Sequence, residues 1–195
     1  MFFIEDSDFL TDEHKKSIEV VRTGNFSYFI QKTHPDTVLS VEGIFLCHVL
    51  IFRPEQRIDN QIYNSDFAEV FEDMLITFCN KNKVEHNETL RAAINLTFNN
   101  GQDQCLPHID HPEDHKQLLI YLNDPIDKES HTVICDKDTP LEVPFQIQQS
   151  HHDDKQKQLK RVVPEKYKGV CFENLPHYQV YPKFGVRLVS VFTFR

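Results

Sequence analysis

The segment Leu90-Arg91-Ala92-Ala93-Ile94-Asn95-Leu96-Thr97-Phe98 has the composition of a short strand, and the turn signal Asn99-Asn100-Gly101 follows it directly. Similar strand-like runs, separated by turn residues, recur to the end of the chain at 117–122, 131–135, 159–163, 169–172, 178–181 and 186–194. Many short strands at close spacing are typical of a β-sandwich or a jelly roll. We therefore expect a mainly β fold of the α+β kind.

The N-terminal half has a different pattern. It predicts helices at 11–21 and 65–79 and strands at 25–30 and 44–52. The second helix carries a long apolar stripe at three- and four-residue steps, which core packing explains fully: Phe67, Val70, Phe71, Met74, Leu75 and Phe78. We expect a single domain over 1–195, in which 1–89 is a supporting region with helices on one sheet face and 90–195 is the β core.

Composition disfavours several classes of function. The 195 residues carry a formal charge of -9, which disfavours nucleic acid as a partner, since phosphate binding needs a basic surface. Five cysteines with no close pair argue against disulfides and a zinc knuckle. Without a signal peptide or a long apolar segment, the chain is expected to be soluble and cytoplasmic, with no membrane partner. The polar stretch 151–160 receives no assigned role.

The segment Leu106-Pro107-His108-Ile109-Asp110-His111 carries the strongest chemical signal. In an extended chain, residues i and i+2 point to the same side, so His108 and Asp110 present an imidazole and a carboxylate to one point. His177 follows on a late strand and completes a two-histidine, one-carboxylate set. Such a triad leaves metal positions open, as a redox iron that binds both a co-substrate and O2 requires.

Arg187 lies in an otherwise apolar strand, and a buried arginine needs an anionic partner. One interpretation is a structural ion pair with one of the thirty acidic residues. The other is a ligand carboxylate, which the planar guanidinium binds through two parallel hydrogen bonds. The ordered set His108, Asp110 and His177 favours the ligand.

The C-terminal half, over about 90–195, resembles the Fe(II)/2-oxoglutarate-dependent oxygenases, and within them the prolyl-hydroxylase-like branch. The resemblance is specific as an ordered set of short segments, which are Phe98-Asn99-Asn100-Gly101-Gln102, His108-Ile109-Asp110, Tyr121-Leu122-Asn123, Gly169-Val170-Cys171-Phe172, Pro176-His177 and Arg187. It implies a double-stranded β-helix, a fold of the jelly-roll or cupin kind. It also implies Fe(II), 2-oxoglutarate and O2 as cofactor and co-substrates.

The resemblance assigns roles to single residues. It implies that His108, Asp110 and His177 bind the metal, that Arg187 pairs with the far carboxylate of 2-oxoglutarate, and that Tyr121 donates a hydrogen bond to it. The alternative for Tyr121 is an ordinary half-buried strand tyrosine. Phe98 stands where the family often has a tyrosine, so Asn95 or Thr97 is the replacement contact to consider.

The implied activity is a dioxygenase that hydroxylates a C–H bond of a protein or peptide, of prolyl type, or of a small molecule, with release of succinate and CO2. Two other classes stay open: a cupin-type metalloenzyme that does not use 2-oxoglutarate, and a non-catalytic jelly-roll binding module. A zinc cluster at His111 and His115 is a weaker alternative, because the acidic residues beside them suggest an exposed loop. The substrate and the oligomeric state are not specified.

One geometric expectation concerns the turn at 182–185. A symmetric hairpin there would pair Arg187 with Val180, and alternation of side chains would put His177 on the opposite face. A shared site between His177 and Arg187 therefore predicts an odd-length loop or a bulge at this turn.

Overall fold

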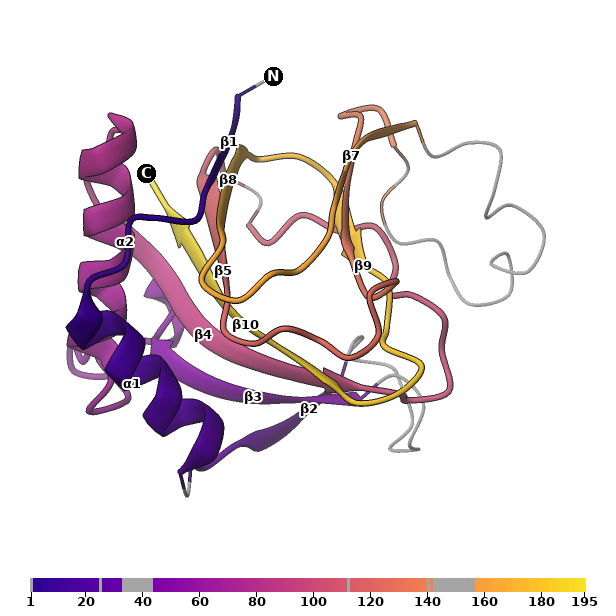
Figure 1. Cartoon of the computed structure of the whole chain (residues 1–195). Helices are drawn as coiled ribbons and strands as arrows, with labels where there is room; N and C mark the ends of the chain where they lie inside the picture. Colours follow the sequence, from indigo (N-terminus) through magenta and orange to yellow (C-terminus); the bar gives the residue numbers. More distant parts are fainter. Residues whose placement is uncertain (1, 25, 33–43, 112, 140, 142–156) are drawn as a thin grey trace.

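The computed structural model describes residues 2–24, 26–32, 44–111, 113–139, 141 and 157–195. Its larger sheet has seven strands in the order β1-β8-β5-β10-β4-β3-β2 (Figure 1). These strands are β1 (Phe3–Asp6), β2 (Phe29–Lys32), β3 (Ile44–Ile51), β4 (Thr89–Phe98), β5 (Lys116–Tyr121), β8 (Gly169–Glu173) and β10 (Val186–Phe194). All neighbouring pairs are antiparallel. The mainly β class that the sequence predicts is confirmed.

A smaller sheet faces one end of the larger one. It has three antiparallel strands in the order β7-β6-β9, which are β6 (Thr132–Cys135), β7 (Gln158–Val162) and β9 (His177–Gln179). Isolated bridges extend it, joining Gln104 to Val180 and His108 to His177. The segment that precedes β5 is thereby held against the outer edge of β9.

Two helices cover the outer face of the larger sheet. They are α1 (Asp12–Thr23) and α2 (Ala68–Asn82), and a 3-10 turn, η1 (Pro54–Gln56), lies between β3 and α2. Thr11 caps α1, accepting a hydrogen bond from the backbone N–H of His14. The predicted apolar stripe of α2 packs against β3, β4, β5 and β10 in the main core. Its most buried members are Phe71, Met74, Leu75 and Phe78.

A second apolar cluster fills the space between the two sheets. It consists of Leu119, Tyr121, Ile134, Val162, Val170, Phe172, Val189 and Val191. Since strand side chains alternate between faces, these residues mark the inner face of the larger sheet. The polar side chains on the same face therefore lie between the two sheets and are shielded from solvent.

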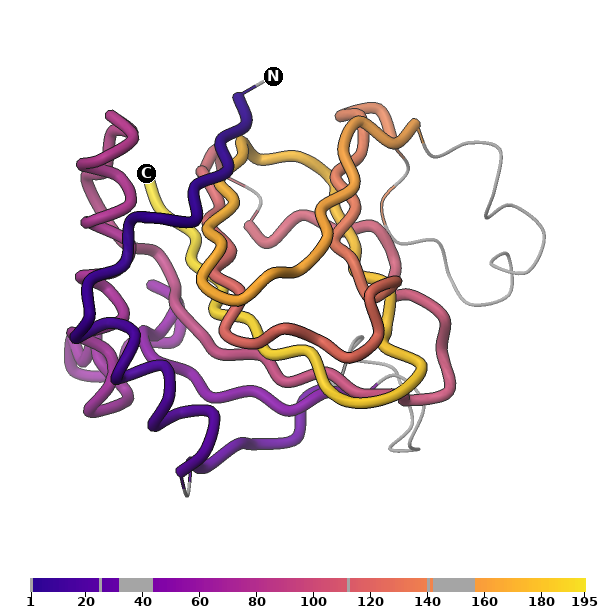
Figure 2. Tube along the Cα trace, viewed as in Figure 1, coloured from indigo at the N-terminus to yellow at the C-terminus, as the bar shows by residue number. Residues whose placement is uncertain are grey.

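The prediction that residues 182–185 form a hairpin turn within one sheet is wrong. The strand before the turn, β9, belongs to the smaller sheet, whereas β10 pairs with β4 and β5 in the larger one. Figure 2 follows this change of sheet along the trace. His177 and Arg187 therefore approach the interior from two facing layers, and neither a bulge nor an odd loop is needed to bring them together.

Other differences from the sequence predictions are small. β1 was not predicted, and β2 begins at Phe29 rather than at residue 25. All five cysteines are free, as expected. Part of the polar stretch 151–160, residues 151–156, lies outside the described residues. Within the described part of the chain, no helix is long and apolar enough to cross a membrane.

Candidate metal and co-substrate site

His108 and His177 are direct neighbours across the edge of the smaller sheet. The backbone N–H of each donates to the carbonyl of the other at 3.0 Å, and the two imidazole centroids are 4.6 Å apart. This single antiparallel bridge brings together two histidines that are far apart in the sequence. The structure thus brings together two of the three predicted metal ligands.

Both imidazoles are oriented in the same way. Nδ1 of His108 lies 2.9 Å from the Leu106 carbonyl, and Nδ1 of His177 lies 3.0 Å from the Leu175 carbonyl. A carbonyl only accepts, so Nδ1 carries the proton and Nε2 keeps a free lone pair in each neutral ring. This tautomer is the one that a metal ligand binding through Nε2 requires.

Asp110 lies beside His177, with its Oδ2 3.8 Å from Nε2 of the imidazole. The Gln117 side-chain amide lies 3.2 Å from the same Nε2, where it can donate to the lone pair. Within the described ranges, no three His, Cys, Asp or Glu side chains already stand in a metal-holding arrangement. The three predicted ligands are adjacent, but a metal would have to draw the Asp110 carboxylate and the rings closer together.

The electrostatics of the three groups differ. Burial lowers the pKa of His177 to about 4, with a further contribution from the nearby His108. Burial acts to raise the pKa of Asp110, but His177, Arg91 and His108 outweigh it and hold that pKa below its usual range. Burial acts to lower the pKa of His108, whereas a hydrogen bond with Cys105 and its charge raise it to about 9. Two of the groups are thus already in their metal-binding protonation state at neutral pH.

Arg187 is enclosed at the far end of the inner face, with 2% of its surface exposed. Its Nη2 donates to Thr132 Oγ1 at 2.7 Å and its Nη1 donates to Gln179 Oε1, both neutral acceptors. Its Nε is buried without a hydrogen-bond partner, and no described carboxylate forms an ion pair with it. The structural ion pair that the sequence left open is therefore not found among the described residues.

Tyr121 lies against Arg187 on the neighbouring part of the face. Its hydroxyl donates to Thr132 Oγ1 at 2.8 Å, and the Arg187 guanidinium lies 5.4 Å from the ring centroid. Tyr121 is fully buried, so the half-buried alternative is wrong. Two donors, from Tyr121 and Arg187, thus converge on one hydroxyl oxygen, which is the pattern a carboxylate oxygen would satisfy.

Sequence reasoning missed three polar residues of this interior, Gln117, Thr132 and Gln179. Gln117 and Thr132 are each 2% exposed. Gln117 carried a readable signal, since a polar side chain in the buried run 117–122 needs a partner. Thr132 and Gln179 carried none, because their roles depend on how the two sheets face each other.

The two residues considered as replacements for the missing tyrosine differ. Thr97 donates to the Arg187 carbonyl at 3.4 Å, so its hydroxyl is used within the sheet. Asn95 pairs with Val189 of β10, which in turn pairs with Tyr121 of β5, so Asn95 shares their inner face. Its Oδ1 is buried without a described partner. Asn95 is the better placed of the two.

The acidic residues Glu113 and Asp114 are exposed, as expected for a loop, but His111 and His115 on either side of them are buried. Nε2 of His111 lies 2.8 Å from Thr193 Oγ1, and Nδ1 of His115 lies 2.8 Å from the Glu113 carbonyl. Their rings meet edge to face with centroids 5.3 Å apart. These histidines are held by protein hydrogen bonds, and no described group including them forms a metal site.

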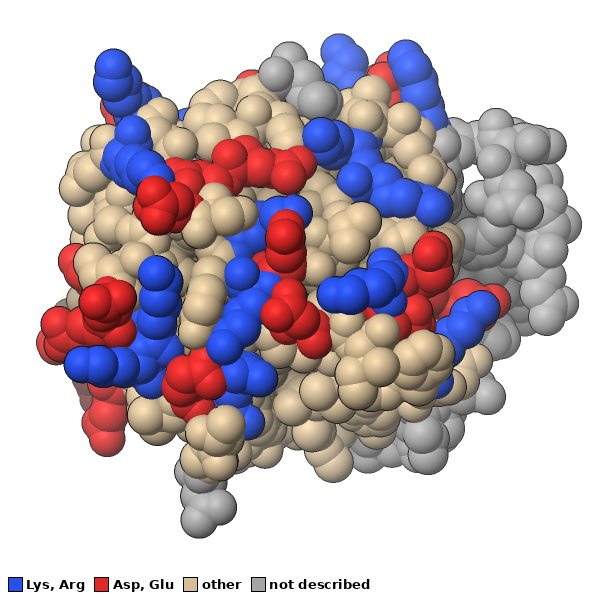
Figure 3. All heavy atoms as spheres, viewed as in Figure 1, with Lys and Arg blue, Asp and Glu red and all other residues tan. Residues whose placement is uncertain are grey.

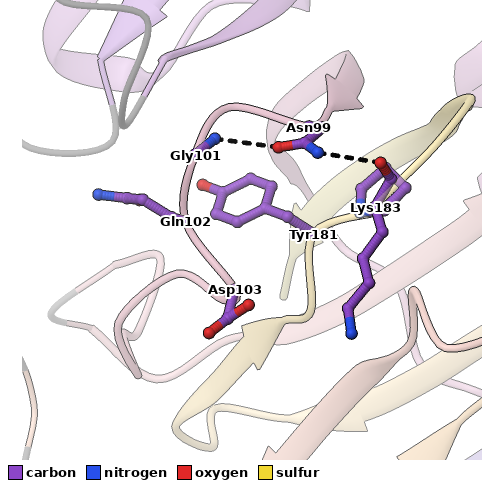
Figure 4. Close-up of a pocket in the computed structure, with 7 residues that line it drawn as sticks. Asn99, Gly101, Gln102, Asp103, Tyr181 and Lys183 are labelled. Carbon is purple, nitrogen blue, oxygen red and sulfur yellow. Dashed lines mark hydrogen bonds between the residues drawn. The ribbon is translucent and has the colours of Figure 1, made fainter.

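A pocket of about 250 Å³ lies outside this interior, at the turns that follow β4 and β9 (Figure 4). It is lined by Asn99, Gly101, Gln102, Asp103, Tyr181, Pro182 and Lys183. Asn99 shapes its rim by accepting from the Gly101 backbone and donating to the Lys183 carbonyl. None of the predicted metal or co-substrate residues lines this pocket.

Comparison with known proteins gives a consistent picture of the fold. No family model matches the sequence, and no curated protein matches it. Similar solved structures include an oxidoreductase of the 2OG-Fe(II) oxygenase family from Burkholderia pseudomallei, with a TM-score of 0.67, 11% identity, and coverage of 98% of this chain and 84% of that chain. A prolyl-4-hydroxylase from Pseudomonas putida has a TM-score of 0.54, 13% identity and coverages of 99% and 92%.

A third similar solved structure is that of a protein named for a different reaction. The non-heme alpha ketoglutarate dependent carbocyclase SnoK from nogalamycin biosynthesis has a TM-score of 0.59, 11% identity and coverages of 98% and 78%. At these identities the likeness establishes the fold. The predicted double-stranded β-helix is thereby confirmed, and the chain shares this fold with the three proteins.

Proposed function

We propose that this chain is a non-haem Fe(II)- and 2-oxoglutarate-dependent dioxygenase that hydroxylates a C–H bond of a peptide, of prolyl type, or of a small molecule. The observation that carries the proposal is Arg187. It is a buried cation with an unpartnered Nε and no acidic partner among the described residues. An arginine in this state requires an anion. It shares its enclosed interior with the His108, Asp110 and His177 cluster.

The residues present fit the absent groups. Two imidazole Nε2 atoms and one ionised carboxylate are the donor set for a redox iron with open positions. Arg187 and Tyr121 offer the charge and the hydrogen bond for the far carboxylate of 2-oxoglutarate. Fe(II), when bound, supplies the chemistry that couples O2 to the co-substrate. One oxygen atom enters succinate as CO2 is lost, and the other enters the substrate as a hydroxyl group.

The chain itself supplies orientation and a dry interior. The Leu106 and Leu175 carbonyls fix the tautomer of both imidazoles. A buried apolar cluster that includes Val189 and Val191 lies between the two sheets, and such low-dielectric surroundings strengthen polar contacts. The Gln117 amide, now at His177 Nε2, is the group that metal binding would displace.

The test compares the wild-type chain with Arg187→Gln, using Arg22→Gln as the control that removes an arginine from the surface of α1. We expect Arg187→Gln to weaken 2-oxoglutarate binding at least tenfold and to leave Fe(II) binding unchanged, because the metal ligands lie elsewhere. Anaerobic titration calorimetry measures both, and release of succinate reports turnover. Equal 2-oxoglutarate binding by all three proteins would refute the co-substrate assignment.

The same measurements separate the two rival classes. A cupin-type metalloenzyme would bind metal through His177 but show no 2-oxoglutarate binding that depends on Arg187. A non-catalytic binding module would release no succinate with any substrate. The proteins of similar structure named above include a prolyl-4-hydroxylase and an enzyme of nogalamycin biosynthesis, so the substrate screen must include peptides and small molecules.

A further inference from the structure

Two arginines flank the predicted metal ligand Asp110. Nη1 of Arg53 donates to the Asp110 backbone carbonyl at 2.7 Å, and Nη1 of Arg91 lies 3.6 Å from Oδ1 of the carboxylate. The second distance is longer than a hydrogen bond, so Arg91 is attracted by the carboxylate without being bound by it. The Asp110 and Arg91 side chains are 11% and 14% exposed.

The register of the sheet places this pair relative to the other parts of the site. Arg91 of β4 pairs with Thr193 of β10, and Thr193 also pairs with Gln117 of β5, the residue that touches His177. Arg91 and Gln117 therefore stand on either side of Thr193 in one row of the inner face. The metal cluster lies at this end of the site.

The co-substrate anchor lies at the opposite end. Arg187 pairs with Thr97, six residues along β4 from Arg91. At about 3.3 Å per residue, the two rows are roughly 20 Å apart. Arg53 and Arg91 therefore cannot serve the carboxylate that Arg187 is proposed to hold.

The charges around Asp110 do not balance. Among the partly buried groups there, two guanidinium groups face one carboxylate, and the second carboxylate that attracts Arg53, Glu55, is exposed to solvent. Burial and the nearby Arg91 both act to lower the pKa of Arg53, as expected for cations held together in a partly enclosed site. A bound metal shares the charge of Asp110 and increases the imbalance. A dianionic co-substrate balances a divalent metal, so the two arginines exceed the single Asp110 carboxylate by one positive charge.

Resting on the proposed function, we propose that Arg53 and Arg91 form a subsite for an anionic substrate, one whose carboxylate or phosphate group lies next to the C–H bond that is oxidised. The hydrogen bond of Arg53 to Asp110 uses one of its five N–H donors. Burial raises the pKa of the nearby Cys47 thiol, and Arg91 acts to lower it. Both guanidinium groups thus have donors left for a planar or tetrahedral anion beside the metal.

The first experiment measures binding of inorganic phosphate to metal-free protein by titration calorimetry. The parent protein carries Arg187→Gln, so that the proposed co-substrate anchor cannot bind the probe. We expect the additional change Arg53→Gln or Arg91→Gln to raise the phosphate dissociation constant at least tenfold. The additional change Arg22→Gln, the matched surface control, should leave it within twofold, because Arg22 is paired with Glu19 far from the site.

Phosphate binding that is equal in the parent, Arg53→Gln and Arg91→Gln proteins would overturn the subsite. So would an equal loss in the Arg22→Gln control, which would indicate a general charge effect. Circular dichroism establishes that each variant is folded, and Arg53→Gln carries the test if Arg91→Gln is unfolded. If the arginines only position Asp110, the variants lose metal affinity and retain phosphate binding.

The second experiment identifies the anion in the substrate. Succinate release with the wild-type chain is compared for carboxylic acids against their neutral amides, and for phosphate esters against the parent alcohols. We expect one charged series to stimulate turnover at least tenfold more than its neutral partners, and the Arg53→Gln variant to lose this preference. A neutral series that stimulates equally would overturn the proposal. Failure of the proposed function appears separately, as absent 2-oxoglutarate binding with intact phosphate binding.

Discussion

At the residue scale, residue type marks the proposed ligands more clearly than the groups that orient them. His108 and Asp110 are adjacent because residues i and i+2 of an extended segment share a side. Arg187 was found because a cation in an apolar strand demands an explanation. The carbonyls of Leu106 and Leu175, which orient the two imidazoles, carry no signal in residue type, since every residue has a carbonyl.

Among the residues that sequence reasoning missed, Thr132 is the one whose substitution we expect to cost the most stability. It accepts hydrogen bonds from both Arg187 and Tyr121 in a fully buried position. Thr132→Val leaves both donors without this acceptor, which costs about 1–3 kcal/mol of unfolding free energy per unsatisfied group. Tyr121→Phe removes one donor and leaves Thr132 paired with Arg187, so a smaller loss is expected. Urea denaturation of the metal-free protein measures both, and the reverse order would contradict this account of the hydrogen bonds.

At the element scale, long patterned segments were predicted well and pairing between strands was not. The apolar stripe of α2 and the cap of α1 are local signals, and both elements formed within a few residues of the prediction. β1 was missed because four residues with two acids carry little strand signal, and its stability comes from pairing with β8. The error at 182–185 has the same origin, since no local signal indicates that β10 leaves the sheet of β9.

Gly169 of β8 lies directly against the Phe78 side chain of α2, which leaves no room for a larger residue at this position. A Cβ at this position would lie 2.8 Å from ring carbons of both Phe9 and Phe78. These rings meet edge to face with centroids 5.0 Å apart and are buried in the main core, so they have little room to move. We expect Gly169→Ala to lower the unfolding free energy by about 1–3 kcal/mol through overpacking.

The second change Phe78→Leu provides the control for that prediction. Leucine is smaller than the ring that the new methyl group meets, so the double variant should lose less stability than the two single losses added together. Chemical denaturation of the four proteins completes the cycle. Strict additivity would mean that the cost of Gly169→Ala does not come from contact with Phe78.

At the scale of the whole molecule, two sheets whose strands alternate along the second half of the sequence enclose the proposed metal and co-substrate residues. Figure 3 shows acidic and basic side chains interspersed on one outer face, in contrast to the arginines gathered around the metal cluster. Composition gives the net charge but not this distribution, because the positions of Arg91 and Arg187 depend on strand register and that of Arg53 on the turn after β3. The predicted architecture followed from the number and spacing of strands, whereas the arrangement of charge required the structure.

Metal binding should stabilise the whole fold, because His177 belongs to the smaller sheet and Asp110 to the segment leading into β5. A ligand that binds only the folded state at one hundred times its dissociation constant adds about 2.7 kcal/mol of unfolding free energy. For a chain of this size, that corresponds to an increase in Tm of roughly 5–10 °C. Anaerobic calorimetry with and without Fe(II) measures the shift. His177→Ala removes one ligand and should abolish most of it, whereas His86→Ala, which removes a histidine bonded to Thr89 outside the cluster, should retain it. Equal shifts in both variants would place the metal elsewhere in the chain.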